Sequence, residues 1–314
     1  MDGFICTYPL ILLIIFSRYT FKIEMKNSYH LNTKLTGLLG HPIKHSYSPL
    51  IHNVAFQLKE LDYLFLPFDV PASNLKTALK GMIGLGIKGF NITIPHKETI
   101  TQYMNNVSEE AAIIGAVNTV VNDMGKLNGY NTDVNGVYET LLPFKEEITG
   151  NDVSVVGAGG AARAVIYALI RYFKPSAIYL INRTEERAES LKNYFRDKTK
   201  YESFKTRELF PPDLIDVFRG SKLIVNATSV GMFPDSDDTI TSLSNSFTKG
   251  QIVFDLVYNP PMTQLLKTAA SEGATVLDGL KMLVYQAAKS FELWTGEEMP
   301  VEEVHKTLQL FIKD

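Results

Sequence analysis

The most informative part of this sequence is Val153-Ser154-Val155-Val156-Gly157-Ala158-Gly159-Gly160-Ala161-Ala162, which an apolar helix follows as far as Leu169. Gly157 suits a tight turn, Gly159 lets backbone approach a diphosphate, and Ala162 still allows the helix to pack closely on the strand. The N-terminus of that helix favours an anion. The pattern predicts a nucleotide-binding turn, although small residues also suit any crowded strand-to-helix turn.

The next apolar strand, residues 177–181, ends at Asn182-Arg183-Thr184. A site for NAD usually carries an acidic residue at this strand end, which binds the ribose 2'-hydroxyl, and none stands here. The guanidinium groups of Arg183 and of Arg187, one helical turn later, match a 2'-phosphate. The charges favour NADP over NAD. The alternative is two solvated arginines at the start of a helix.

Length and composition limit the classes of protein to consider. The 314 residues are enough for about two domains. The 31 basic and 34 acidic residues are well mixed and give a net charge of -3, so no nucleic-acid surface is expected and small molecules are the expected partners. The single cysteine, Cys6, excludes an intrachain disulfide and fits a reducing compartment, which favours the cytoplasm. No metal site is predicted.

Residues 1–33 differ from the rest of the chain. The apolar run from Tyr8 to Phe16 is shorter than the about 20 residues that span a bilayer as a helix. Asp2 stands where a signal peptide would be basic, and no clear cleavage site follows. We interpret residues 1–33 as an appendage or a mis-assigned start, with Met25 as the alternative first residue. No membrane association is expected, and tethering is the alternative.

Strands predicted at residues 34–40, 63–68 and 88–94 alternate with helices, which indicates a first, mostly parallel α/β domain. After the first strand come Ser46 and Ser48, and Ser48 suits the N-cap of the following helix. Two such serines are often only capping residues. Their place beyond the carboxyl end of a strand, however, is where ligands bind in open α/β sheets, so we expect a polyhydroxylated ligand there.

Polar residues also gather after later strands. Asn91 and Thr93 alternate with isoleucines and so share one face of their strand. Lys97 follows, where a chain that leaves a sheet typically enters the active-site cleft. The commoner explanation for a single lysine near a helix start is an exposed side chain. Two further segments hold more amides and hydroxyls than strand ends need, even allowing for Asx-turns. They are Asn118-Thr119 and Asn131-Thr132-Asp133.

Three more strands are predicted after the glycine turn, at residues 221–225, 252–257 and 274–277. Each ends in small or hydrogen-bonding residues that could line a nicotinamide or a substrate ring. An amphipathic helix over residues 280–293 contains Gln286, and a final helix covers residues 301–312.

These blocks, in this order, resemble the shikimate dehydrogenases from Lys34 to the C-terminus. The resemblance depends on motifs along the whole chain: Gly40-His41-Pro42-Ile43, His45-Ser46-Tyr47-Ser48-Pro49, His52-Asn53, Asn91-Ile92-Thr93-Ile94-Pro95-His96-Lys97, Gly115-Ala116-Val117-Asn118-Thr119, Asn131-Thr132-Asp133, the glycine turn, Asn182-Arg183-Thr184, Asn226-Ala227-Thr228-Ser229, Tyr258-Asn259-Pro260, and Asp278-Gly279-Leu280-Lys281-Met282-Leu283-Val284-Tyr285-Gln286.

The resemblance implies two α/β domains. Residues 34–132 and 279–314 would form a substrate-binding catalytic domain, and residues 133–278 a Rossmann domain that binds NADP(H), with the C-terminal helices returning to the first domain. Residues 1–33 have no counterpart. The implied activity is the NADP-dependent interconversion of 3-dehydroshikimate and shikimate, a step of aromatic amino acid and chorismate biosynthesis.

The resemblance also assigns roles to individual residues. Lys97 and Asp133 would be the catalytic pair. The substrate would be bound by Ser46, Ser48, Thr93, Asn118, Tyr258 and Gln286. The cofactor would be bound by Gly157, Ala158, Gly159, Gly160, Ala161, Asn182, Arg183, Thr184, Arg187, Thr228, Val257, Gly279 and Met282.

The chemistry of the catalytic pair supports that assignment. Hydride delivery to a ketone leaves negative charge on its oxygen, which an ammonium group such as that of Lys97 stabilises and protonates. A carboxylate such as that of Asp133 would orient the ammonium. Two alternatives stay open: a quinate or dual quinate/shikimate dehydrogenase, since one ring hydroxyl separates the substrates, and a nucleotide-binding protein without catalysis. A monomer and a homodimer fit the sequence equally.

Overall fold

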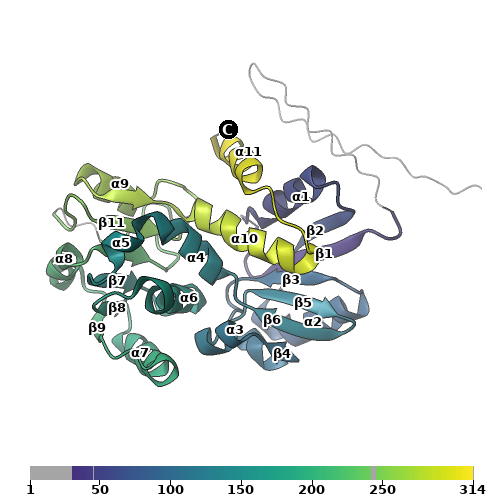
Figure 1. The fold of residues 1–314 in the computed structure, drawn as a ribbon, viewed down its shortest axis with the longest axis horizontal. Helices are drawn as coiled ribbons and strands as arrows, with labels where there is room; N and C mark the ends of the chain where they lie inside the picture. Colours follow the sequence, from purple (N-terminus) through teal and green to yellow (C-terminus); the bar gives the residue numbers. More distant parts are fainter. Residues whose placement is uncertain (1–29, 45, 242–244, 314) are drawn as a thin grey trace, which may run out of the picture.

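Two six-stranded sheets form the frame of the protein in the computed structural model, which describes residues 30–44, 46–241 and 245–313 (Figure 1). The expectations for Cys6, Met25 and most of the N-terminal extension lie outside the described residues, and so does His45 of the serine loop. Among the described residues, no helix is both long and apolar enough to cross a membrane.

The first sheet has the strand order β2-β1-β3-β5-β6-β4 and is mixed. Three of its pairings are parallel, β1 with β2, β1 with β3 and β4 with β6, and β5 runs antiparallel to both of its neighbours, β3 and β6. The strands are β1 (Lys34–Gly40), β2 (Tyr63–Asp69), β3 (Gly89–Ile92), β4 (Asn106–Val107), β5 (Thr119–Asp123) and β6 (Lys126–Tyr130).

The second sheet has the order β12-β11-β10-β7-β8-β9, and all of its pairings are parallel. Numbered within the sheet, this is the doubly wound order 3-2-1-4-5-6 of a Rossmann fold, which places a ligand crevice between β7 and β10. The strands are β7 (Val153–Val156), β8 (Ile178–Asn182), β9 (Phe204–Glu208), β10 (Leu223–Asn226), β11 (Ile252–Asp255) and β12 (Thr275–Leu277).

Helices pack around both sheets. They are α1 (Ser48–Leu58), α2 (Leu75–Gly84), α3 (Glu109–Ile114), α4 (Asp133–Leu141), α5 (Lys145–Ile148), α6 (Gly160–Ala168), α7 (Glu185–Thr199), α8 (Pro211–Gly220), α9 (Gln264–Ser271), α10 (Gly279–Thr295) and α11 (Val301–Lys313). The strands and helices predicted from the sequence are all present, with ends shifted by a few residues. One prediction is wrong: the N-cap of α1 is Tyr47, and Ser48 is already the first helical residue.

Helix α10 joins the two halves of the molecule (Figure 1). It contacts α4 and also packs on α1, which covers the first sheet, and on α11, which packs on α1 in turn. Met282 near its start belongs to the core of the second sheet, while Leu280, Val284 and Phe291 belong to the core beneath α1. The C-terminal helices therefore return to the first sheet, as expected.

His52, from one of the motifs of the resemblance, is part of a core. Its ring stacks on Phe65 at 4.4 Å between centroids and lies 5.0 Å from Trp294. Burial lowers the pKa of His52 to about 3, and the neighbouring side chain of Asn91 opposes part of that shift. The imidazole is therefore neutral at physiological pH and supports the fold from the inside.

Candidate active site

The glycine turn connects β7 to α6 at the carboxyl edge of the second sheet. Gly157 has a φ of +118°, and a Cβ there would lie 2.9 Å from the carbonyl oxygen of Ala227 and 3.1 Å from Cγ2 of Thr228. Only glycine fits that position, because both the backbone angle and the neighbouring strand exclude a side chain. A Cβ on Gly159, in contrast, would meet nothing within 4 Å.

The turn therefore has an open side at Gly159, directly before the N-terminus of α6. Gly160 is the first residue of that helix, so the backbone N–H groups of its first turn have no partners within the helix. An open glycine turn and a helix N-terminus together suit a diphosphate. The residues present thus fit the phosphate groups of a dinucleotide.

The end of β8 carries the two arginines. Arg183 and Arg187 are both exposed, and the ion pairs of the described residues include neither. The side chain of Asn182 donates to the carbonyl oxygen of Thr184 at 2.9 Å, which closes the loop before α7. Both guanidinium groups are available for a phosphate.

Thr228, Val257 and Gly279 line the neighbouring strand ends. The hydroxyl of Thr228 donates to Oδ1 of Asn226 at 2.6 Å, and Val257 N donates to Oδ1 of Asp255 at 3.0 Å. A Cβ on Gly279 would lie 2.2 Å from the carbonyl oxygen of Leu256, so α10 begins in close contact with the second sheet.

Asp255 underlies this edge and was missed in the sequence analysis. Its carboxylate accepts from Asn226 at 2.9 Å and from the Thr263 hydroxyl at 2.7 Å. Burial raises the pKa of Asp255 to about 6, although these hydrogen bonds oppose the shift. One signal could have revealed it: an acidic residue closes the apolar strand Ile252–Asp255.

Lys97 and Asp133 meet in an ion pair. Nζ of Lys97 lies 2.5 Å from Oδ2 of Asp133, and the side chains are only 17% and 6% exposed. Asp133 begins α4, and the backbone of Lys97 is anchored by the N–H of Val117, which donates to its carbonyl oxygen at 2.7 Å. A Cβ on Gly160 would lie 3.0 Å from Cβ of Lys97. The pair therefore lies at the mouth of the glycine turn.

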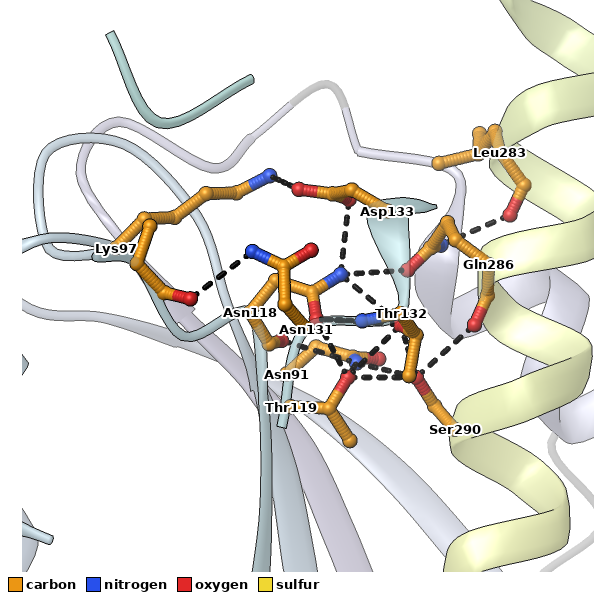
Figure 2. Close-up of polar contacts among 11 residues, drawn as sticks. Asn91, Lys97, Asn118, Thr119, Asn131, Thr132, Asp133, Leu283, Gln286 and Ser290 are labelled. Carbon is orange, nitrogen blue, oxygen red and sulfur yellow. Dashed lines mark hydrogen bonds and ion pairs between the residues drawn. The ribbon is translucent and has the colours of Figure 1, made fainter. Parts of the chain in front are cut away.

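Asn118 connects this pair to helix α10 (Figure 2). Its Nδ2 donates to Oδ1 of Asp133 at 2.8 Å and faces Oε1 of Gln286 at 3.4 Å. Both carboxylate oxygens of Asp133 thus have donors, Lys97 on one and Asn118 on the other. Gln286 in turn donates to the carbonyl oxygen of Leu283 at 2.8 Å.

The two serines form a second group with Tyr258. Oγ of Ser46 lies 3.2 Å from Oγ of Ser48, and Ser46 also hydrogen-bonds the hydroxyl of Tyr258. Burial raises the pKa of Tyr258, and the bond to Ser46 opposes that shift. Thr93 lies near this loop, since its methyl group packs where a Cβ on Gly40 would be.

Comparison with known proteins identifies the family. Residues 38–120 match the shikimate dehydrogenase substrate binding domain, residues 141–264 the shikimate / quinate 5-dehydrogenase model, and residues 279–309 the shikimate 5'-dehydrogenase C-terminal domain. A shikimate dehydrogenase (NADP(+)) of Caldanaerobacter subterraneus is 43% identical over 277 residues, which cover 88% of this chain and 97% of that protein. The chain belongs to the shikimate dehydrogenase family.

Solved structures of shikimate dehydrogenases and their relatives have the same fold. A crystal structure of a shikimate dehydrogenase in complex with NADP+ superposes with a TM-score of 0.82 at 40% identity, covering 90% of this chain and 97% of that one. A quinate dehydrogenase from Corynebacterium glutamicum in complex with NAD gives 0.80 at 32% identity, covering 88% and 99%. The predicted family and fold class are confirmed.

The residues expected from the shikimate dehydrogenase resemblance fall into three groups in this structure. Lys97, Asn118, Asp133 and Gln286 form one hydrogen-bonded network, and Ser46, Ser48 and Tyr258 form another. Within the described residues, no hydrogen bond between side chains joins these two networks, and none includes the hydroxyl of Thr93. The cofactor candidates surround the edge of the second sheet. Their assigned roles stay predictions.

Proposed function

We propose that this chain catalyses the reversible, NADPH-dependent reduction of 3-dehydroshikimate to shikimate. The observation that carries the proposal is the shielded Lys97–Asp133 pair at the mouth of the glycine turn, with Nζ and Oδ2 2.5 Å apart. A nucleotide-binding protein without catalysis has no need of such a pair there. The relative named above as a shikimate dehydrogenase (NADP(+)) supports the substrate and the cofactor.

The reaction requires that the negative charge on the carbonyl oxygen of the substrate be stabilised and that this oxygen receive a proton. NADPH, when bound, supplies a hydride to the carbonyl carbon of the substrate. The ammonium group of Lys97 stabilises the negative charge that develops on the carbonyl oxygen and donates the proton to it. Asp133, itself held by Asn118, keeps the ammonium in place and accepts hydrogen bonds from ring hydroxyls.

The remaining candidates hold the two ligands. Ser46 and Ser48 are proposed to bind the substrate carboxylate, and Thr93, Tyr258 and Gln286 to contact the ring. The glycine turn is proposed to hold the diphosphate of the cofactor. The nicotinamide is proposed to be held by Thr228 and Val257 at the strand ends, together with Gly279 and Met282. This corresponds to a substrate domain of residues 34–132 and 279–314 and an NADP domain of residues 133–278, in a cytoplasmic monomer or homodimer.

Initial rates with two substrates and two cofactors test the proposal. We expect shikimate with NADP+ to give the highest kcat/KM among shikimate or quinate with NADP+ or NAD+. Quinate turned over as well as shikimate would favour the dual-specificity alternative. Absence of turnover with all four pairs would contradict the proposed activity.

Removing the two arginines should reverse part of the cofactor preference. In the Arg183→Ala, Arg187→Ala double variant we expect KM for NADP+ to rise about 10- to 100-fold, since hydrogen bonds to a charged phosphate are lost. KM for NAD+ should change little. Arg196→Ala is a matched control, because this exposed arginine lies further along α7 and pairs with Glu202. An unchanged preference would contradict the 2'-phosphate assignment.

A methyl group at Gly160 should displace Lys97. The new Cβ of Gly160→Ala would lie 3.0 Å from Cβ and 3.2 Å from Cδ of Lys97, so the lysine must move. We expect kcat to fall by up to about 10-fold, since Lys97 has to give way by a few tenths of an ångström and a misplacement of about 1 Å can cost about 100-fold. Gly159→Ala is the matched comparison: its Cβ meets no protein atom within 4 Å, so it should raise KM for NADP+ more than it lowers kcat.

A further inference from the structure

Ser290 is the buried polar residue that links helix α10 to the first sheet. It lies one helical turn after Gln286 and has no solvent exposure. Its Oγ lies 2.9 Å from Nδ2 of Asn91, 2.8 Å from Oγ1 of Thr119 and 3.1 Å from Oγ1 of Thr132. The carbonyl oxygen of Gln286 lies 3.1 Å away as a fourth neighbour, and a hydroxyl has one donor and two acceptor sites, so these contacts exceed what it can bond at one time (Figure 2).

The same cluster fixes which way the amide of Asn118 faces. The backbone N–H of Thr132 points at Oδ1 of Asn118 from 2.6 Å, and a backbone N–H can only donate. Oδ1 also accepts from the hydroxyl of Thr119 at 3.0 Å. The NH2 group must therefore face the other way, toward the carboxylate of Asp133 at 2.8 Å.

Asn91 sets the direction of the hydroxyl protons. Its Nδ2 is 3.0 Å from Oγ1 of Thr119 and 2.9 Å from Oγ of Ser290. Because both hydroxyls accept from this amide, their own protons point onward. The proton of Thr119 can go to Oδ1 of Asn118 and that of Ser290 to the carbonyl oxygen of Gln286, 3.1 Å away, while either oxygen can donate in the contacts of these hydroxyls with each other and with Thr132.

We propose that Ser290 is a positioning residue for the reaction. Together with Thr119, it keeps Asn118 in a fixed position relative to Gln286, and Asn118 in turn holds Asp133. This inference rests on the proposed function. None of Ser290, Thr119 and Asn91 is assigned a ligand here, and the first two are fully buried. They act through Asn118, Asp133 and Gln286, which lie directly before β5, at the start of α4 and in α10. The buried hydroxyls join those elements through hydrogen bonds, in addition to the packing of α10 on α4.

Removing either hydroxyl tests the inference. For Ser290→Ala and for Thr119→Val we expect kcat/KM for shikimate to fall about 10-fold or more, because Asn118 and Gln286 lose their fixed relation. The Kd of NADPH, measured by fluorescence titration, should stay within about twofold, because the hydrogen bonds given above for these hydroxyls include no residue of the glycine turn or of the second sheet. Thr119→Ser keeps the hydroxyl and should retain near-normal kcat/KM.

Ser154→Ala is the matched control for a buried serine. Ser154 is also fully buried, and its Oγ bonds Oγ of Ser221 at 2.7 Å within the second sheet, so its loss should lower thermal stability without changing kcat/KM. If Ser290→Ala and Thr119→Val only lose stability in the same way, the inference is wrong. Should Ser290→Ala fail to fold, the comparison of kcat/KM between Thr119→Val and Thr119→Ser tests the inference instead. A wild-type protein inactive on shikimate would instead reject the proposed function.

Discussion

Replacing Lys97 with alanine is expected to lower kcat for shikimate oxidation by about 100- to 10,000-fold, the usual contribution of a positioned acid-base group. The ammonium lies 2.5 Å from Asp133 in a shielded site, and no other lysine or arginine of the described part of the chain belongs to that network. Without it, neither the charge on the substrate oxygen nor the transferred proton has a partner. Steady-state rates at saturating NADP+ and shikimate measure the effect.

The fold and the cofactor site should survive this change. The backbone of Lys97 is held through its carbonyl oxygen by Val117, and the side chain, apart from its ion pair with Asp133, packs its aliphatic stem beside Gly160. Lys97→Met keeps that stem and removes the charge, so it should lose as much activity as Lys97→Ala. Thermal unfolding and the Kd of NADPH serve as controls. Near-normal turnover in either variant would refute the role of Lys97.

The sequence alone predicted the elements whose signals are local. The glycine turn after Val153–Val156 was correctly read as a strand-to-helix connection, since a turn with Gly157 at φ +118° permits few other residues. In contrast, the polar edge strand β9 (Phe204–Glu208) was missed, because an exposed edge has no clear hydrophobic pattern.

Contacts between residues far apart in the sequence could not be predicted from local sequence patterns. Lys97 and Asp133 are 36 residues apart, and only the resemblance paired them before the structure did. Ser290 lies on an amphipathic helix whose apolar face gives no reason to single out a serine. Its partners Asn91 and Thr119 are 199 and 171 residues away in the chain. One signal existed: Ser290 follows Gln286 by four residues, which places both on the same face of α10.

Replacing Asp133 with asparagine is the second change with a large expected effect. Each carboxylate oxygen now faces a donor, Lys97 on Oδ2 and the amide of Asn118 on Oδ1. An asparagine has one oxygen, so its NH2 group must face one of these donors, and the ammonium of Lys97 loses its counter-charge in a shielded site. We expect kcat/KM for shikimate to fall about 100-fold or more, with NADPH binding unchanged.

The double variant Lys97→Ala, Asp133→Asn shows whether the two residues act as one unit. Because Asp133 is proposed to act mainly by orienting Lys97, its loss should matter little once the ammonium is gone. The double variant should therefore lose about as much kcat/KM as Lys97→Ala alone, since groups that act together are strongly non-additive. If the two single losses multiply instead, Asp133 contributes independently, by binding substrate hydroxyls, and the ion pair is not the source of its effect.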